Sequence, residues 1–197
     1  MISTTSTLTD KYKNYSNILC KIKRDVDNEH LIRLNRGLYE SDKNTNPIFI
    51  AQAIVPNSYI SFDYALSRYG LIPEKVFSVT CASFNNKKDK TFSNYFGTFR
   101  YSDIPNRVFH LGLMLVQDGE YACRFASKEK AICDSLFKWP KVRSIKDLKI
   151  LMFEDKRIDE EEFSNCDFNS LIEIASAYKR TNHDLLIKMI KKEYLHG

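Results

Sequence analysis

The side chains best suited to chemistry in this chain lie on two adjoining segments near its N-terminus. Apolar residues recur with helical spacing over residues 15–26 and predict a helix whose buried stripe is formed by Tyr15, Ile18, Leu19, Ile22 and Val26. The opposite face is basic and consists of Lys13, Asn17, Lys21 and Arg24, with Lys23 on its flank. Asparagine and arginine can pair with adenine and guanine edges in the major groove, whereas lysine is suited to phosphates. The predicted helix therefore carries the residue types of a DNA-reading element.

A short hairpin follows this helix directly. The apolar segments 31–34 and 38–39 flank the turn Asn35-Arg36-Gly37, in which the glycine can adopt a positive φ. Arg33 and Arg36 would extend from the hairpin toward a phosphate backbone or a minor groove. A basic helix followed by such a hairpin is the outline of a winged DNA-binding unit. The same residues also fit a solvated helix face beside an ordinary hairpin, because runs of charge usually serve solvation.

The bulk composition is that of a folded chain with a modest positive charge. Its 197 residues are 43% hydrophobic and 13% aromatic, enough for one good core or for a small and a medium domain. The net charge of +5 is compatible with a polyanionic partner. The N-terminus is rich in serine and threonine without an apolar signal core, and no stretch approaches the apolar length of a membrane span. We therefore expect a cytoplasmic protein with no membrane contact.

The usual sequence signatures of enzymes are missing. The five cysteines are widely spaced without a C-x-x-C pair, which argues against a disulfide framework and a zinc site. The four histidines, His30, His110, His183 and His196, show no metal-ligand or nucleophile-triad spacing. The six glycines form neither a G-x-G-x-x-G motif nor a P-loop. We expect no catalytic residues, no metal and no cofactor.

One later cluster has the residue types of a catalytic or phosphate-binding site, namely Ser127, Glu129, Lys130 and Asp134. The cluster would suggest a metal-dependent nuclease of the Asp…Glu-x-Lys type. In that motif the glutamate lies two residues before the lysine, whereas Glu129 is directly adjacent to Lys130. With Ser127 as the N-cap of a helix, Glu129 lies in the first turn, where the helix dipole favours a negative charge. We therefore favour a structural role, in which Lys130 or Asp134 pairs with polar groups of the sheet.

The remaining pattern predicts an α+β fold. Residues 1–9 look like a polar arm, and the polar segment 41–46 places a boundary between an abbreviated N-terminal winged-helix unit, 1–43, and a larger domain, 44–197. The larger domain is predicted to hold an antiparallel or mixed sheet with strands at 76–82, 92–101, 108–116 and 120–125. Helices are predicted at 48–55, at 62–69 with Ser61 as N-cap, and at 128–137, 145–153, 159–163, 169–178 and 184–194.

Four segments of the chain together resemble the AbiEi-type antitoxin family of abortive-infection toxin–antitoxin systems. They are L-I-R-L-N-R-G-L-Y-E, P-N-S-Y-I-S-F-D-Y-A-L-S-R-Y-G-L-I-P, V-F-S-V-T-C-A and F-A-S-K-E-K-A-I-C-D-S-L-F. The resemblance implies a phage-defence regulator of type IV systems that binds operator repeats through a winged helix and represses its own operon. Its larger domain would counteract a nucleotidyltransferase-like toxin. Carried onto this chain, the DNA-contacting residues are Asn17, Lys21, Arg24, Arg33 and Arg36.

The sequence departs from the family pattern at its start. A complete winged helix-turn-helix has two helices before the reading helix, which takes about 30 residues at ordinary element lengths. Only residues 1–14 precede it here, so one short helix fits. Three interpretations remain open. The larger domain buttresses the unit, a homodimer supplies the missing surface, or operator binding is lost and the chain is a toxin-neutralising module without DNA binding.

Overall fold

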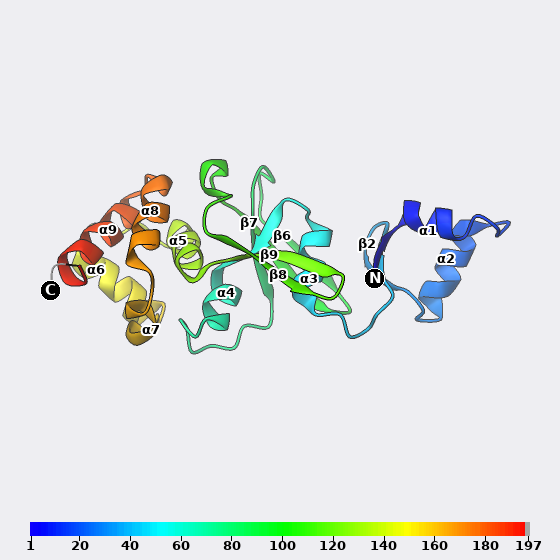
Figure 1. Ribbon diagram of the computed structural model, residues 1–197, viewed down its shortest axis with the longest axis horizontal. Helices are drawn as coiled ribbons and strands as arrows, with labels where there is room; N and C mark the ends of the chain where they lie inside the picture. The colour runs from blue at the N-terminus through cyan, green and yellow to red at the C-terminus, as the bar shows by residue number, and fades with distance from the viewer. Residues whose placement is uncertain (196–197) are drawn as a thin grey trace.

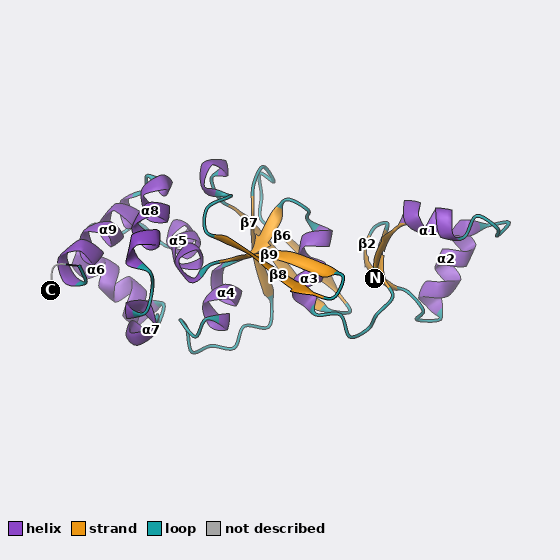
Figure 2. Ribbon diagram, in the orientation of Figure 1, coloured by secondary structure: helices purple, strands orange, loops and turns teal. Residues whose placement is uncertain are grey.

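The computed structural model describes residues 1–195, which form two sheets with helices around them (Figure 1). Figure 2 shows the larger sheet in the middle of the molecule, between a small N-terminal unit and a group of C-terminal helices. The predicted α+β class is therefore confirmed.

The N-terminal unit is a three-stranded antiparallel sheet with two helices. Its elements in chain order are β1 (Ile2–Thr4), α1 (Thr5–Lys11), α2 (Ile18–Asp27), β2 (Ile32–Asn35) and β3 (Leu38–Glu40). The strand order is β1-β3-β2, so the predicted hairpin β2–β3 is extended by the first strand of the chain. The unit has a small hydrophobic cluster of its own, formed by Leu8, Ile22, Leu31 and Tyr39.

The polar arm predicted for residues 1–9 is wrong, because these residues form β1 and most of α1. Thr4 and Thr7 satisfy the helix start reciprocally: the Thr7 amide donates to Thr4 Oγ1 at 3.2 Å, and the Thr4 amide donates to Thr7 Oγ1 at 2.8 Å. Leu8 then lies buried beneath the helix. A capping box built from threonines gives this segment a structure that its polar composition conceals.

The larger sheet has six strands in the order β6-β7-β5-β4-β9-β8. They are β4 (Ser58–Ile60), β5 (Val79–Ser83), β6 (Lys90–Asn94), β7 (Gly97–Asp103), β8 (Leu113–Asp118) and β9 (Tyr121–Ala126). The pairs β4–β9 and β5–β7 are parallel and the other three pairs are antiparallel, so the sheet is mixed.

Two of the predicted strands are divided or shortened. The segment predicted as one strand, 92–101, contains a turn between β6 and β7, where Gly97 has a φ of 121° and the Phe96 amide donates to Asn94 Oδ1. The strand predicted from residue 108 begins at Leu113, because η1 (Asn106–Val108) is a 3₁₀ turn and Gly112 has a φ of 60°.

Helices lie on and beyond the larger sheet. They are α3 (Pro47–Ile54), α4 (Phe62–Arg68), α5 (Lys128–Lys138), α6 (Ile145–Lys149), α7 (Glu160–Ser164), α8 (Phe168–Tyr178) and α9 (Thr181–Glu193). The predicted helix 145–153 is α6 continued by the π-helical turn η2 (Ile150–Asp155). The predicted start at Ser144 is confirmed, since its side chain accepts from the Asp147 amide. In Figure 1 the helices from α5 onward gather at the end of the molecule opposite α1 and α2.

Candidate nucleic-acid interface

The second helix of the N-terminal unit, α2, turns a different face to the core than its spacing predicts. Ile22 and Asp25 are its buried residues, whereas Leu19 is 69% exposed and Tyr15, which precedes the helix, is 51% exposed. The predicted buried stripe is therefore wrong at Leu19 and Tyr15. The cause is Asp25, which takes a buried position and rotates the helix away from Leu19. The exposed face consists of Leu19, Cys20, Lys23, Arg24 and Asp27.

Lys21 forms an ion pair with the buried carboxylate of Asp25. Its Nζ lies 2.5 Å from Asp25 Oδ1 and also stands over the rings of Tyr12 and Tyr15, at 5.2 Å and 5.5 Å from their centroids. Burial acts to raise the pKa of Asp25, but the hydrogen bond from Lys21 and other neighbouring donors outweigh it, so this pKa lies below its ordinary value. The placement of Lys21 on the free basic face is thus corrected: it is a half-buried ion-pair partner.

Asn17 is the N-cap of α2. Its side-chain oxygen accepts from the Cys20 amide at 3.0 Å, which uses the acceptor of the side chain and leaves its NH₂ group as a donor. Asn17 is exposed at the N-terminal end of the helix, where the helix dipole favours a phosphate.

The arginines expected at the interface all remain exposed. Arg24, Arg33 and Arg36 have no ion-pair partner within residues 1–195. Arg33 pairs in register with Tyr39 of β3, so both project from the face of the small sheet that packs on α2. Arg33 and Lys23 line one hollow of about 370 Å³ between α2 and the hairpin. Lys23 of α2 and Arg33 of the hairpin therefore share a surface, whereas Arg24 and Arg36 do not line this hollow.

The hairpin turn has the geometry that its sequence predicts. Gly37 has a φ of 73°, and its carbonyl accepts from the Thr5 amide at 2.9 Å. Arg36 precedes it at the tip of the hairpin, with its amide bonded to Asn35 Oδ1 at 2.7 Å. The tip is thus tied to the start of α1, and the Arg36 side chain is left free.

The larger domain holds the hairpin from behind. Leu34 is 3% exposed and belongs to the main hydrophobic core, and its carbonyl accepts from Asn94 Nδ2 at 3.1 Å. The buried Glu40 accepts from the amides of Ser41 and Asp42 and from the Tyr121 hydroxyl at 3.1 Å. This geometry favours the first of the three interpretations of the short N-terminal unit, in which the larger domain buttresses it.

The cluster at the start of α5 forms a buried polar network. Lys130 and Asp134 are both 0% exposed, and their charged groups lie 3.2 Å apart. Asp134 accepts from the hydroxyls of Tyr59 at 2.9 Å and Ser61 at 2.6 Å, and from Tyr178. The predicted pairing of Lys130 or Asp134 with polar groups of the sheet is confirmed, because Tyr59 belongs to β4. A substrate does not reach these two side chains in this structure.

Lys130 and His183 complete the network. Lys130 Nζ donates to the Val108 carbonyl at 2.8 Å and to the Tyr178 hydroxyl at 2.7 Å, and burial lowers its pKa. The His183 ring stacks on the Tyr178 ring, with the two ring centroids 4.2 Å apart. Burial lowers the pKa of His183 to about 4. Its Nε2 lies 2.9 Å from the Cys133 carbonyl, so the neutral imidazole donates there. Sequence reasoning missed His183 and Tyr178, since a lone residue at helical spacing carries no signal.

The predicted N-cap position of α4 is confirmed at Ser61, but the Ser61 side chain does not cap the helix. The Ser61 hydroxyl donates to Asp134 and makes no cap bond, and the position is filled from β5 instead. Thr80 Oγ1 accepts from the Tyr64 amide at 3.0 Å and donates to the Ser61 carbonyl at 2.6 Å. A cap supplied from another strand cannot be read from the helix sequence alone.

Two other features are absent from residues 1–195. No group of three or more histidine, cysteine, aspartate or glutamate side chains in this range is placed to hold a metal ion; His196 lies outside the described residues. No helix in the described part of the chain is long and apolar enough to cross a membrane. Comparison of the chain with protein-family models and with curated proteins found no match.

Proposed function

We propose that this protein is a DNA-binding antitoxin that represses its own operon, with a nucleotidyltransferase-like toxin as its partner. The observation that carries the DNA-binding part is the element order β1-α1-α2-β2-β3 with the strands arranged β1-β3-β2, in which a hairpin directly follows α2. This order supports roles for α2 as the reading helix and for the hairpin as the wing. The exposed Arg24, Arg33 and Arg36 support it, because they lie on those two elements. The antitoxin part follows from the family resemblance.

Each basic group has a separate task in this proposal. Arg24 lies on the exposed face of α2 and reads a base edge in the major groove, where arginine pairs best with guanine. Arg33 and Arg36 contact phosphates or the adjacent minor groove from the wing. The Asn17 amide donates to a phosphate at the helix N-terminus. Lys21 acts indirectly, by holding Asp25 and thereby the orientation of α2.

The small size of the unit favours binding in pairs. A single module of this kind buries about 600–1,000 Å² on DNA, which is the low end of specific interfaces. Two copies on two operator repeats would double the contacts, and the symmetry of the site would match that of a homodimer.

The DNA-binding part is tested by fluorescence anisotropy with a labelled fragment of the chain's own promoter, titrated at several salt concentrations. Replacing Arg33 or Arg36 with alanine is expected to weaken binding and to lower the slope of log K against log salt by about one each. Arg24→Ala is expected to reduce discrimination between operator and random DNA. Arg143→Ala, an exposed arginine in the C-terminal region, is the matched control and leaves binding unchanged. Absence of any complex at low salt would overturn this part.

A second candidate is a toxin-neutralising module without DNA binding. The exposed Leu19 and Asp27 on α2 favour it, since an apolar side chain and a carboxylate are poor partners for phosphates. The DNA titration above separates the two candidates. Co-expression of the adjacent toxin with the full chain, wild type or carrying Arg24→Ala, Arg33→Ala and Arg36→Ala together, tests whether neutralisation needs these arginines. Growth rescue by the triple variant shows that neutralisation is independent of DNA binding. Rescue by neither protein contradicts the antitoxin assignment.

A further inference from the structure

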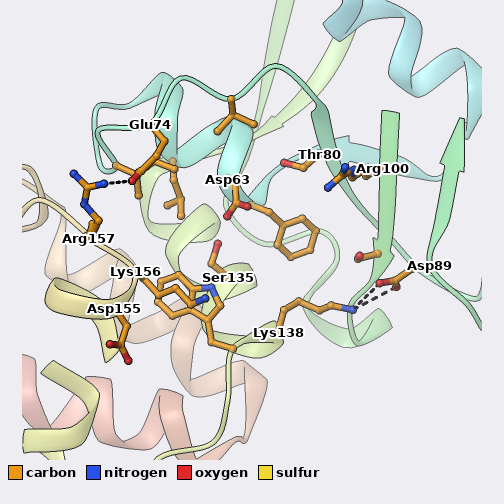
Figure 3. Close-up of a pocket in the computed structure, with 16 residues that line it drawn as sticks. Asp63, Glu74, Thr80, Asp89, Arg100, Ser135, Lys138, Asp155, Lys156 and Arg157 are labelled. Carbon is orange, nitrogen blue, oxygen red and sulfur yellow. Dashed lines mark hydrogen bonds and ion pairs between the residues drawn. The ribbon is translucent and has the colours of Figure 1, made fainter. Parts of the chain in front are cut away.

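A cleft of about 570 Å³ lies beside the larger sheet, on the side of the C-terminal helices (Figure 3). The strands β5 and β7 supply Thr80 and Arg100, the helix α4 supplies Phe62 and Asp63, and the end of α5 supplies Ser135 and Lys138. The residues that follow η2 close the other end. This volume is that of a small-molecule site. In Figure 1 the helices α4 and α5, which line the cleft, lie apart from α2, so the cleft is separate from the proposed DNA interface.

Three departures from ordinary backbone and packing meet at this cleft. Phe62 has a φ of 55°, a strained value for a bulky side chain. The π-helical turn η2 ends at Asp155, which also lines the cleft. The Ser135 hydroxyl is buried, with its residue 1% exposed, yet it finds no hydrogen-bond partner among the described residues. Strained backbone, π-helical turns and unsatisfied buried polar groups all concentrate at functional sites.

The two ends of the cleft differ in chemistry. At one end, Arg100 has no ion-pair partner within residues 1–195, and Lys138 Nζ is held only loosely by Asp89, at 3.4 Å from both carboxylate oxygens. At the other end is the Trp139 ring, with Lys156 Nζ 5.8 Å from its centroid. Figure 3 places Asp63 and Ser135 between these ends. Arg100, Lys138 and the Asp89 carboxylate therefore lie at one end of the cleft, Asp63 and Ser135 in the middle, and the Trp139 ring with Lys156 at the other end.

We propose that this cleft binds a nucleoside 5′-phosphate. The phosphate lies between Arg100 and Lys138, where two cations supply charge-assisted hydrogen bonds. The ribose hydroxyls donate to the Asp63 carboxylate, the interaction by which acidic side chains recognise ribose in dinucleotide sites. The Ser135 hydroxyl gains its missing partner on the same sugar. The base packs against Trp139, which offers the apolar and π surface that a planar ring requires.

The test is calorimetric titration of the full chain with AMP and with GMP, and separately with ribose 5-phosphate and inorganic phosphate. At least one nucleotide is expected to bind with a dissociation constant below about 1 mM. Arg100→Gln is expected to weaken it about tenfold or more, the equivalent of one charge-assisted hydrogen bond. Asp63→Asn is expected to weaken it less. Arg68→Gln, an exposed arginine on α4 outside the cleft, is the control and leaves the affinity unchanged.

Three results would overturn the proposal: no heat of binding with either nucleotide at millimolar concentration, inorganic phosphate binding as tightly as the nucleotides, or Arg100→Gln and Asp63→Asn both binding with wild-type affinity. Thermal unfolding of each variant establishes that it is folded before titration. Because Arg100 and Asp63 are exposed, both variants are expected to melt close to the wild type. DNA binding is measured separately with the promoter fragment, so failure of nucleotide binding leaves the proposed function unaffected.

Discussion

Replacing Asp134 with alanine removes the only carboxylate within 4 Å of the Lys130 ammonium among the described residues. Lys130 is fully buried, so its charge is left without compensation in a medium that solvates it poorly. Breaking a buried ion pair in this way costs about 3–5 kcal/mol of folding free energy. The hydroxyls of Tyr59 and Ser61 lose their acceptor at the same time, which places the expected loss at the upper end of this range. Against a typical total of about 5–15 kcal/mol, the variant is severely destabilised.

The assay is urea unfolding followed by circular dichroism, with the free energy extrapolated to water. Lys130→Met is expected to cost less than Asp134→Ala, because the remaining carboxylate keeps three hydroxyl donors. The double variant Lys130→Met with Asp134→Ala removes both charges and is expected to lose less stability than the sum of the two single losses. A loss below about 1 kcal/mol for Asp134→Ala, or single losses that simply add in the double variant, would refute the reasoning.

Three further predictions concern packing, the ion pair in α2 and pH. Gly112→Ala is expected to destabilise the fold by about 2 kcal/mol or more in thermal unfolding, because Gly112 has a positive φ and an added Cβ would lie 2.7 Å from Ile174 Cδ1. Gly119→Ala is the control for the effect of positive φ alone, because its added Cβ would meet nothing within 4 Å. Lys21→Ala is expected to lower both the melting temperature and the DNA affinity, whereas Arg24→Ala lowers only the affinity. The pKa of His183 in the folded state, about 4, lies below its unfolded value, so the contribution of His183 to stability is fully present above about pH 6.5 and is lost as the pH falls toward 4. His183→Phe should therefore flatten this part of the curve of stability against pH. An unchanged curve would exclude His183 as the cause.

Local signals in the sequence predicted the elements that depend on local chemistry. Ser127 begins α5, the turn before Gly37 forms the hairpin, and Ser144 begins α6, each through bonds between residues a few positions apart. The α+β class follows from the same kind of signal. These features are predictable because the residues that cause them are neighbours in the chain.

The errors arise where a distant partner changes the local preference. Ser61 has the residue type of an N-cap, but Asp134, 73 positions later, takes its hydroxyl and Thr80 supplies the cap. Leu19 has the type and spacing of a core residue, but the pair of Lys21 and Asp25 occupies the buried side of α2. In both cases one buried carboxylate imposes the arrangement, and a carboxylate at a core position is the pattern that helical spacing of apolar residues cannot anticipate.

The N-terminal unit depends on the larger domain for its own structure. Its separate cluster has only four buried apolar residues, and chains of about 40 residues rarely bury enough surface to fold without further support. The support comes from Leu34, which packs into the main core, and from Glu40, which bonds to Tyr121. The hairpin is therefore fixed relative to the larger domain, which would reduce the ordering entropy that the proposed DNA binding must overcome. If the proposed function holds, we expect a partner that contacts the larger domain near Asn94 and Tyr121 to alter the orientation of Arg33 and Arg36, and thereby the affinity for DNA, without touching DNA.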